Sequence, residues 1–249
     1  MQRRADYGYD APYALIIFAA LGSACVLVAI AALLRHRAPL ALPTGLYGAF
    51  FLGNAFSFLY TTRRGKFIEW RKILDRIQLR GDERVLDMGC GRGAVLIAAA
   101  NRMKNGRVTG VDLWSTRDQS GNARQVTLRN AALEGVQDRI EIATGDMRAL
   151  PFREGSFDVV ISSLAIHNIP SNAGRAEAIA EAWRVLKPGG RVAIADIRAT
   201  ARYARTFREL GAIGTERRRL GWRFWYGNPF ASTSLVTARK PGAAAAERY

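Results

Sequence analysis

The chain has 249 residues, of which 49% are hydrophobic and 23% are charged, and its formal net charge is +16. This length suits one domain plus a short additional segment, and the apolar content excludes intrinsic disorder of the whole chain. Cys25 and Cys90 are the only cysteines, which excludes a disulfide-stapled scaffold and a four-ligand zinc site. The basic charge predicts an anionic partner, with nucleic acid and phospholipid as the obvious classes.

The first 62 residues are apolar and carry only four Arg and two Asp. Residues 11–34 contain no charge, and about 20 apolar residues are enough for a helix to cross a bilayer. A second uncharged run, 38–62, follows Arg35 and Arg37. The first run is longer than the apolar part of a signal peptide, which is about 7–15 residues. We therefore expect residues 1–62 to form one or two transmembrane or interfacial helices, with a pair of buried core helices as the alternative.

Basic residues crowd the segment that follows the second apolar run. Apolar residues recur there with a helical period, so we expect a basic amphipathic connecting helix at 63–80. The positive-inside rule then places the following domain in the cytoplasm, at the inner face of the cell membrane. The basic turn at Arg35 and Arg37 argues against a simple two-pass hairpin. One pass followed by an interfacial helix remains the other reading.

From residue 81 the sequence alternates between predicted strands and predicted helices. Such alternation is typical of a doubly wound, Rossmann-like α/β domain whose parallel sheet is covered on both faces. We expect this domain to span 81–240 and residues 241–249 to form a flexible tail. Strands are expected at 84–87, 107–113, 139–144, 157–164 and 191–196, helices at 94–103, 119–135, 175–186 and 200–210, and two further extended runs at 215–226 and 233–239.

A glycine-rich loop, 87–93, follows the first expected strand and precedes a helix. Its glycines let a ligand lie against the backbone, and the helix start offers free N–H groups. The spacing also fits the dinucleotide fingerprint GxGxxA. However, Asp87 would repel a pyrophosphate and suits an ammonium group, while Asp112 and Asp146 end the next two strands. A ligand with an amino-acid end, a ribose and an adenine matches these three carboxylates, and S-adenosylmethionine is such a ligand.

Five ordered motifs together resemble the class I S-adenosylmethionine-dependent methyltransferase family. They lie at 85–93, 110–113, 145–147, 157–160 and 184–190. The resemblance implies a seven-stranded sheet with an antiparallel last strand and S-adenosylmethionine as cofactor. It implies that Asp87, Gly89, Gly91 and Gly93 hold the methionine part, Asp112 the ribose, Leu113 and Trp114 the faces of the adenine, and Asp146 and Met147 its amine edge, with Ser162 also at the cofactor.

Two further features bear on the acceptor. His167 follows the fourth strand, in a stretch that resembles small-molecule and lipid-modifying members of the family. An imidazole there suits a general base, and the alternative is a purely structural histidine. Near the end of the chain, Trp222, Phe224 and Tyr226 would share one face of a strand. That row is expected to be core, with an aromatic substrate wall as the alternative.

These observations predict a membrane-attached methyltransferase that acts on a small hydrophobic or lipid-like acceptor. Anionic phospholipid would be the surface that the basic residues meet, and the segment 60–76 would form part of the active-site mouth. No metal site is expected. The alternatives are an RNA- or ribosome-directed methyltransferase, a non-catalytic membrane-bound protein of the same fold, and, last, a dinucleotide-dependent oxidoreductase.

Overall fold

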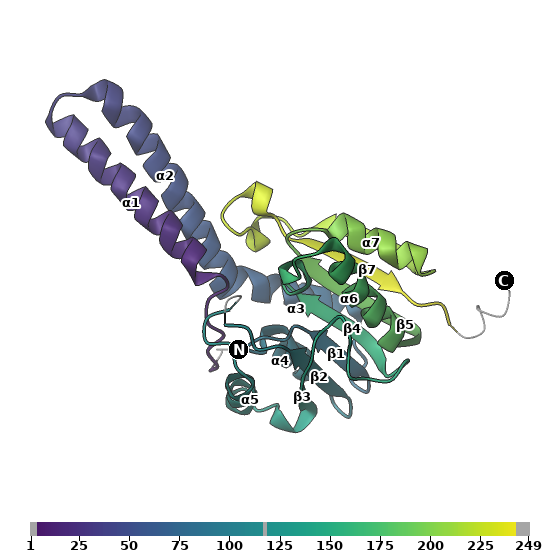
Figure 1. The fold of residues 1–249 in the computed structure, drawn as a ribbon. Coiled ribbons are helices and arrows are strands. Elements are labelled where there is room, and N and C mark those ends of the chain that lie inside the picture. Colours follow the sequence, from purple (N-terminus) through teal and green to yellow (C-terminus); the bar gives the residue numbers. More distant parts are fainter. Residues whose placement is uncertain (1–3, 117–118, 243–249) are drawn as a thin grey trace.

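A computed structural model describes residues 4–116 and 119–242 of the chain (Figure 1). Most of the tail expected at 241–249 therefore lies outside the described residues, as do two residues of the connection after the second strand. The described part consists of a long helical hairpin and an α/β domain joined by a continuous run of helix.

The domain is built on one seven-stranded sheet with the order β3-β2-β1-β4-β5-β7-β6. The first five strands in the chain pair in parallel, and β7 is antiparallel to both of its neighbours. The expected sheet with an antiparallel last strand is thus confirmed. The strands are β1 (Arg84–Met88), β2 (Arg107–Asp112), β3 (Ile140–Thr144), β4 (Phe157–Ser163), β5 (Leu186–Asp196), β6 (Ile213–Arg219) and β7 (Ser234–Arg239).

Helices cover both faces of the sheet, because the central strands are apolar on both sides. In β1, the fully buried Val85 and Leu86 point to opposite faces and belong to separate hydrophobic clusters. One cluster is covered by α3 (Lys66–Ile77), α4 (Ala94–Ala100) and α5 (Arg124–Leu133), the other by α6 (Asn172–Val185) and α7 (Thr200–Glu209). This arrangement leaves the carboxyl ends of the parallel strands open at one edge.

The hairpin consists of α1 (Pro12–Leu34) and α2 (Ala38–Tyr60), which run antiparallel and project from the domain (Figure 1). Small residues allow the close contact: a Cβ at Gly22 would lie 2.8 Å from Leu52 Cγ, and one at Gly48 would lie 2.7 Å from Val26 Cγ2. Among the described helices, only α1 meets the length and hydropathy criteria for a membrane span; its mean hydropathy is 2.7 and 11% of it is buried. A π-helical turn, Thr61–Gly65, joins α2 directly to α3.

The extended run expected at 215–226 is wrong in its second half. Strand β6 ends at Arg219, and Trp222–Phe224 forms a 3-10 turn. The physical reason is Gly221, whose φ of 78° breaks the extended backbone. Phe224 and Tyr226 are buried, whereas Trp222 is exposed, so the three aromatic residues do not share one strand face.

Candidate active site

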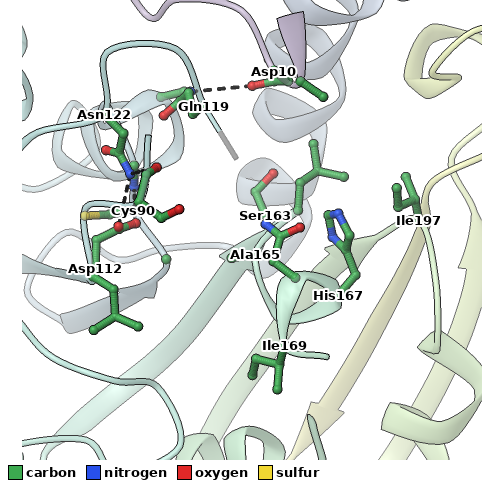
Figure 2. A pocket seen from close by; sticks show the side chains of 18 of the residues that line it. Asp10, Cys90, Asp112, Gln119, Asn122, Ser163, Ala165, His167, Ile169 and Ile197 are labelled. Atoms are coloured by element: carbon green, nitrogen blue, oxygen red, sulfur yellow. Dashed lines mark hydrogen bonds between the residues drawn. The ribbon is translucent and has the colours of Figure 1, made fainter. Parts of the chain in front are cut away.

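A cavity of about 570 Å³ lies at the carboxyl ends of the parallel strands, where β1 and β4 are neighbours and the strand order reverses. Figure 2 shows Asp112 on one side of it and His167 on the other. The cavity brings together eight residues that the sequence analysis assigned to the site: Asp87, Gly89, Gly91, Asp112, Leu113, Asp146, Met147 and His167.

Asp87, at the end of β1, is a buried carboxylate without a partner. It is 1% exposed, and neither carboxylate oxygen has a hydrogen-bond partner among the described residues. Burial, together with the nearby Asp112 carboxylate, raises the pKa of Asp87 to about 8. A buried carboxylate that lines a cavity and lacks a partner suits a cationic ligand group, so the ammonium of a bound amino-acid moiety fits this position.

The glycine loop is packed closely against two neighbouring segments of the chain. A Cβ at Gly89 would collide with Ala165, and one at Gly91 would collide with the Gln119 side chain. Both glycines also have positive φ, as does Gly93, which directly precedes α4. Gly93 does not line the cavity, so its role in the structure is to make the turn into α4.

Asp112, at the end of β2, is held by the loop that it faces. Its carboxylate accepts hydrogen bonds from the backbone N–H groups of Gly91 (2.8 Å) and Trp114 (2.6 Å). The Asn122 side chain donates a third, at 3.1 Å. These bonds fix the carboxylate at the cavity wall, and an ionised carboxylate can accept about four hydrogen bonds in all. The arrangement fits a ligand with neighbouring hydroxyl groups.

Of the residues that were predicted to contact the adenine, three line the cavity and one lies outside it. Leu113 and Met147 line it, Leu113 being largely exposed. The Asp146 carboxylate also lines it but is bound by the Arg148 guanidinium, whose hydrogen bonds lower the pKa of Asp146. Trp114 does not line the cavity; its indole N–H donates to Thr144 Oγ1 at 2.8 Å.

Ser162 is likewise outside the cavity. It is fully buried in β4, and its hydroxyl donates to the Met88 carbonyl of the neighbouring β1 at 2.7 Å. The next residue, Ser163, lines the cavity instead and accepts a hydrogen bond from the Trp70 indole at 2.8 Å. Ser162 thus joins two strands, and Ser163 faces the ligand space.

His167 has a partner that the sequence analysis did not identify. Its Nδ1 lies 2.6 Å from Oδ1 of Asp196, a buried residue at the end of β5. Asp196 is fixed by the backbone N–H groups of His167 (2.9 Å) and Ile197 (2.8 Å), and by the Tyr203 hydroxyl (3.2 Å). Because Nδ1 faces Asp196, Nε2 is the ring nitrogen left for the cavity. The pair is a close contact and not an aligned hydrogen bond, because Nδ1 has no hydrogen-bond partner among the described residues.

Residues 4–10, here called the N-terminal strap, lie across the glycine loop. The Arg92 guanidinium pairs with Asp6 (2.8 Å), and the Asn130 amide donates to the Asp6 carbonyl (2.8 Å). The strap's far end is also anchored, because the Arg4 backbone N–H donates to Glu134 (2.9 Å). This covering segment was not foreseen from the sequence.

The strap ends at Asp10, which is the centre of a buried polar cluster. The Lys66 ammonium contacts both of its oxygens at 2.8 Å, and the hydroxyls of Thr62 and Tyr226 each donate at 2.8 Å. Burial alone would raise the pKa of Asp10, but the Lys66 charge and these hydrogen bonds outweigh it, so the pKa lies below its ordinary value. Asp10, Lys66 and Tyr226 all line the cavity.

Comparison with known proteins agrees with this geometry. Residues 86–194 match a family model described as a methyltransferase domain. The chain is 35% identical over 127 residues to a 27-O-demethylrifamycin SV methyltransferase of Amycolatopsis mediterranei, which covers 50% of this chain and 42% of that protein. It is 32% identical over 130 residues to a demethylmenaquinone methyltransferase of Lactiplantibacillus plantarum, which covers 51% of each. The chain thus spans about half the length of these curated relatives.

A solved structure shares the fold. A geranyl diphosphate C-methyltransferase from Streptomyces coelicolor, in complex with Mg²⁺, geranyl diphosphate and S-adenosyl-L-homocysteine, superposes with a TM-score of 0.57 and 17% identity. The match covers 72% of this chain and 80% of that one. At this identity the likeness shows the fold alone.

The fold and the matched domain define a protein of the Rossmann-like methyltransferase class. Residues 86–194 are a methyltransferase domain, and S-adenosylmethionine is its cofactor. The methyltransferase domain, its fold and its cofactor, as predicted from the sequence, are confirmed. The individual ligand contacts of Asp87, Asp112 and Asp146 stay predictions.

Proposed function

We propose that this protein transfers a methyl group from S-adenosylmethionine to a small hydrophobic or lipid-like acceptor at a membrane. The single observation that carries the proposal is one cavity with two unlike ends. The partnerless Asp87 carboxylate and the glycine loop lie on the side of Asp112, His167 lies on the opposite side, and apolar side chains of the hairpin also line the cavity.

In this proposal Asp87 and the loop glycines hold the amino-acid part of the cofactor, Asp112 holds its ribose, and Leu113 with Met147 contacts its adenine. The chemistry that bound S-adenosylmethionine supplies is an electrophilic methyl group on a sulfonium. The chain's contribution is to position the acceptor and to exclude water from it. The N-terminal strap closes the cofactor end, which restricts access of solvent on that side.

His167 is proposed to take a proton from the acceptor. The Asp196 carboxylate, 2.6 Å from Nδ1, stabilises the imidazolium that forms, while Nε2 receives the proton. This assignment suits an acceptor group that becomes nucleophilic only on losing a proton, such as a phenol. The demethylmenaquinone methyltransferase among the relatives, by its name, acts on a substrate of hydrophobic character, which supports the same class of acceptor.

Membrane attachment is the second part of the proposal. Helix α1 is about 34 Å long at 1.5 Å per residue, which is enough for a hydrocarbon core of about 30 Å. Large apolar side chains are exposed along both hairpin helices, and Arg63 and Arg64 are exposed where the hairpin meets the domain. Such cations contribute about 1 kcal/mol each beside an anionic leaflet.

Three measurements test this proposal. Calorimetry of the detergent-solubilised protein should detect binding of S-adenosylhomocysteine; failure of the full chain to bind it would overturn the cofactor site. Incubation of a membrane extract with methyl-labelled S-adenosylmethionine should place the label in the lipid fraction. Label confined to RNA would refute the lipid-like acceptor and favour the nucleic-acid alternative instead. Flotation with vesicles of phosphatidylglycerol and phosphatidylcholine tests attachment, and protein that stays with the soluble fraction would contradict it.

A further inference from the structure

The acceptor end of the cavity is built by the hairpin itself. Tyr13, Ala14 and Phe18 of α1 line it, as does Phe58 of α2. Ala231, in the connection between β6 and β7, closes it from another side. These residues come from segments far apart in the sequence, and none belongs to the sheet.

The β6–β7 connection is fixed to α2 and to the turn that follows α2 by specific contacts. The Thr61 hydroxyl donates to the Trp225 carbonyl at 2.5 Å, and the Asn228 amide donates to the Asn54 side chain at 2.8 Å. The rings of Phe58 and Tyr226 meet edge to face, with centroids 5.0 Å apart. The β6–β7 connection is therefore held against α2 and the turn that follows it by three contacts, and apolar side chains of both sides line the cavity between them.

The cavity reaches the protein surface at the first turn of α1. Tyr13 lines the cavity and is also 61% exposed. The exposed Ile16 and Ile17 follow it on the same helix. Phe230, which is 98% exposed, lies in the neighbouring connection. Exposed apolar side chains on the outer surface of the hairpin are thus continuous with Tyr13, which lines the cavity beside the polar cluster of Asp10, Lys66 and Tyr226.

We propose that this apolar end binds the hydrocarbon chain of the acceptor, and that the chain enters sideways from the bilayer at Tyr13. The acceptor is then a single-chain amphiphile whose nucleophilic head reaches His167 while its chain lies against Phe18 and Phe58. This inference rests on the proposed function. It makes the hairpin a wall of the active site as well as an anchor.

The test uses the full chain in vesicles of phosphatidylglycerol and phosphatidylcholine, with hexadecanol carrying a mid-chain diazirine as the probe. After illumination, mass spectrometry should map cross-links to residues that line the cavity: Phe18, Phe58, Tyr226 and Ala231. In Ala14→Trp, cross-linking at Phe58 and Ala231 should fall at least about fivefold, because an indole overfills a packed apolar site. Ala20→Trp is the matched control: Ala20 lies on the same helix, is exposed and does not line the cavity, so its cross-links should match the parent's.

Affinity for S-adenosylhomocysteine, measured on the same samples, separates the two proposals. If the parent binds it but cross-links map only to the outer hairpin surface, such as Phe56, the chain site is overturned and the proposed function stands. The same holds if Ala14→Trp and Ala20→Trp lose cross-links equally. A parent that binds no S-adenosylhomocysteine overturns the proposed function, while its cross-links still decide the chain site. If Ala14→Trp loses this affinity through misfolding, Ala231→Trp takes its place, with the same loss expected at Phe18 and Phe58.

Discussion

The two ends of the cavity are built in different ways. At the cofactor end, Asp87 and Asp112 sit at the ends of adjacent strands, and backbone N–H groups hold the second. At the acceptor end, the walls come from α1, α2 and the β6–β7 connection, which meet only through tertiary contacts. The sheet thus positions the residues of the cofactor end, whereas the hairpin positions those of the acceptor end. Cofactor affinity and turnover should therefore respond to different substitutions.

The largest expected effect is on turnover alone. His167→Gln removes the proposed base, so kcat should fall by about 10²–10⁴-fold. Affinity for S-adenosylhomocysteine should stay unchanged because Asp87 and Asp112 are untouched. Asp196→Asn should lower kcat in the same direction by disturbing the orientation of the ring. Labelled methyl transfer measures the first effect and calorimetry the second. Unchanged kcat in His167→Gln would make the residue structural and remove the distinction between the two ends.

The next largest effect belongs to the cofactor end. Asp112→Ala removes an ionised acceptor for the ribose hydroxyls, and each hydrogen bond to a charged group contributes about 1.5–3 kcal/mol. Two such bonds correspond to a loss of about 100-fold or more in affinity for S-adenosylhomocysteine, which calorimetry measures. Asp138→Ala is the control, since this carboxylate is 70% exposed and outside the cavity. Equal affinities in the two variants would remove Asp112 from the ligand site.

A pH dependence sharpens the assignment of Asp87. Because its pKa is about 8 in the ligand-free protein, pairing with an ammonium requires loss of a proton below that pH. Affinity for S-adenosylhomocysteine should therefore rise with pH, by up to about tenfold per unit between pH 6.5 and 8. Asp87→Asn should flatten this dependence. A parent affinity that is constant over the same range would contradict the pairing.

The same group should affect stability with the opposite sign. Folding raises the pKa of Asp87 from the ordinary 3.8 to about 8. Its favourable contribution to ligand-free stability is therefore full below pH 3.8 and is lost as the pH rises through about 8. Relative to Asp87→Asn, the parent should lose thermal stability across this window, and a constant difference between the two would refute the raised pKa.

The smallest effect concerns Trp114. Its indole is bonded to Thr144 outside the cavity, so Trp114→Phe should cost about 1 kcal/mol in the free energy of unfolding. Affinity for S-adenosylhomocysteine should change by less than about twofold, or about 0.4 kcal/mol, because Trp114 does not line the cavity. Denaturant unfolding and calorimetry measure the two quantities. A large loss of affinity would instead indicate that the indole contacts the adenine, as the family resemblance implied.

The sequence predicted the cofactor end because strand patterns are local. Alternating apolar strands and a glycine loop place Asp87 and Asp112 at one edge of any parallel sheet. Asp196 also lies at this edge, because β4 and β5 are neighbours and their carboxyl ends meet. The sequence did not predict its role, because a single aspartate outside a motif does not indicate a site. Ser162 shows the limit of this resolution. Adjacent strand residues face opposite sides, so an error of one position exchanged Ser162 for Ser163.

The acceptor end was beyond sequence reasoning. Tyr13 and Phe18 read as lipid-facing residues of an apolar run, and nothing local indicates that the first turn of α1 returns to the domain. That placement depends on Asp10, whose partners Thr62, Lys66 and Tyr226 lie 52 to 216 residues away. The expected mouth at 60–76 was partly right, since Lys66 lines the cavity while Trp70 is buried behind Ser163.

The N-terminal strap also determines how an embedded hairpin crosses its bilayer. Asp6 and Asp10 fasten the chain before α1 to the same domain that follows α2. Under the proposed membrane attachment, both ends of the hairpin would lie in one compartment, and the chain would either cross twice or turn back within the membrane. A single crossing would pull the strap away from the glycine loop. A membrane-impermeant thiol reagent should accordingly label cysteines placed at residue 9 and in the domain from the same side.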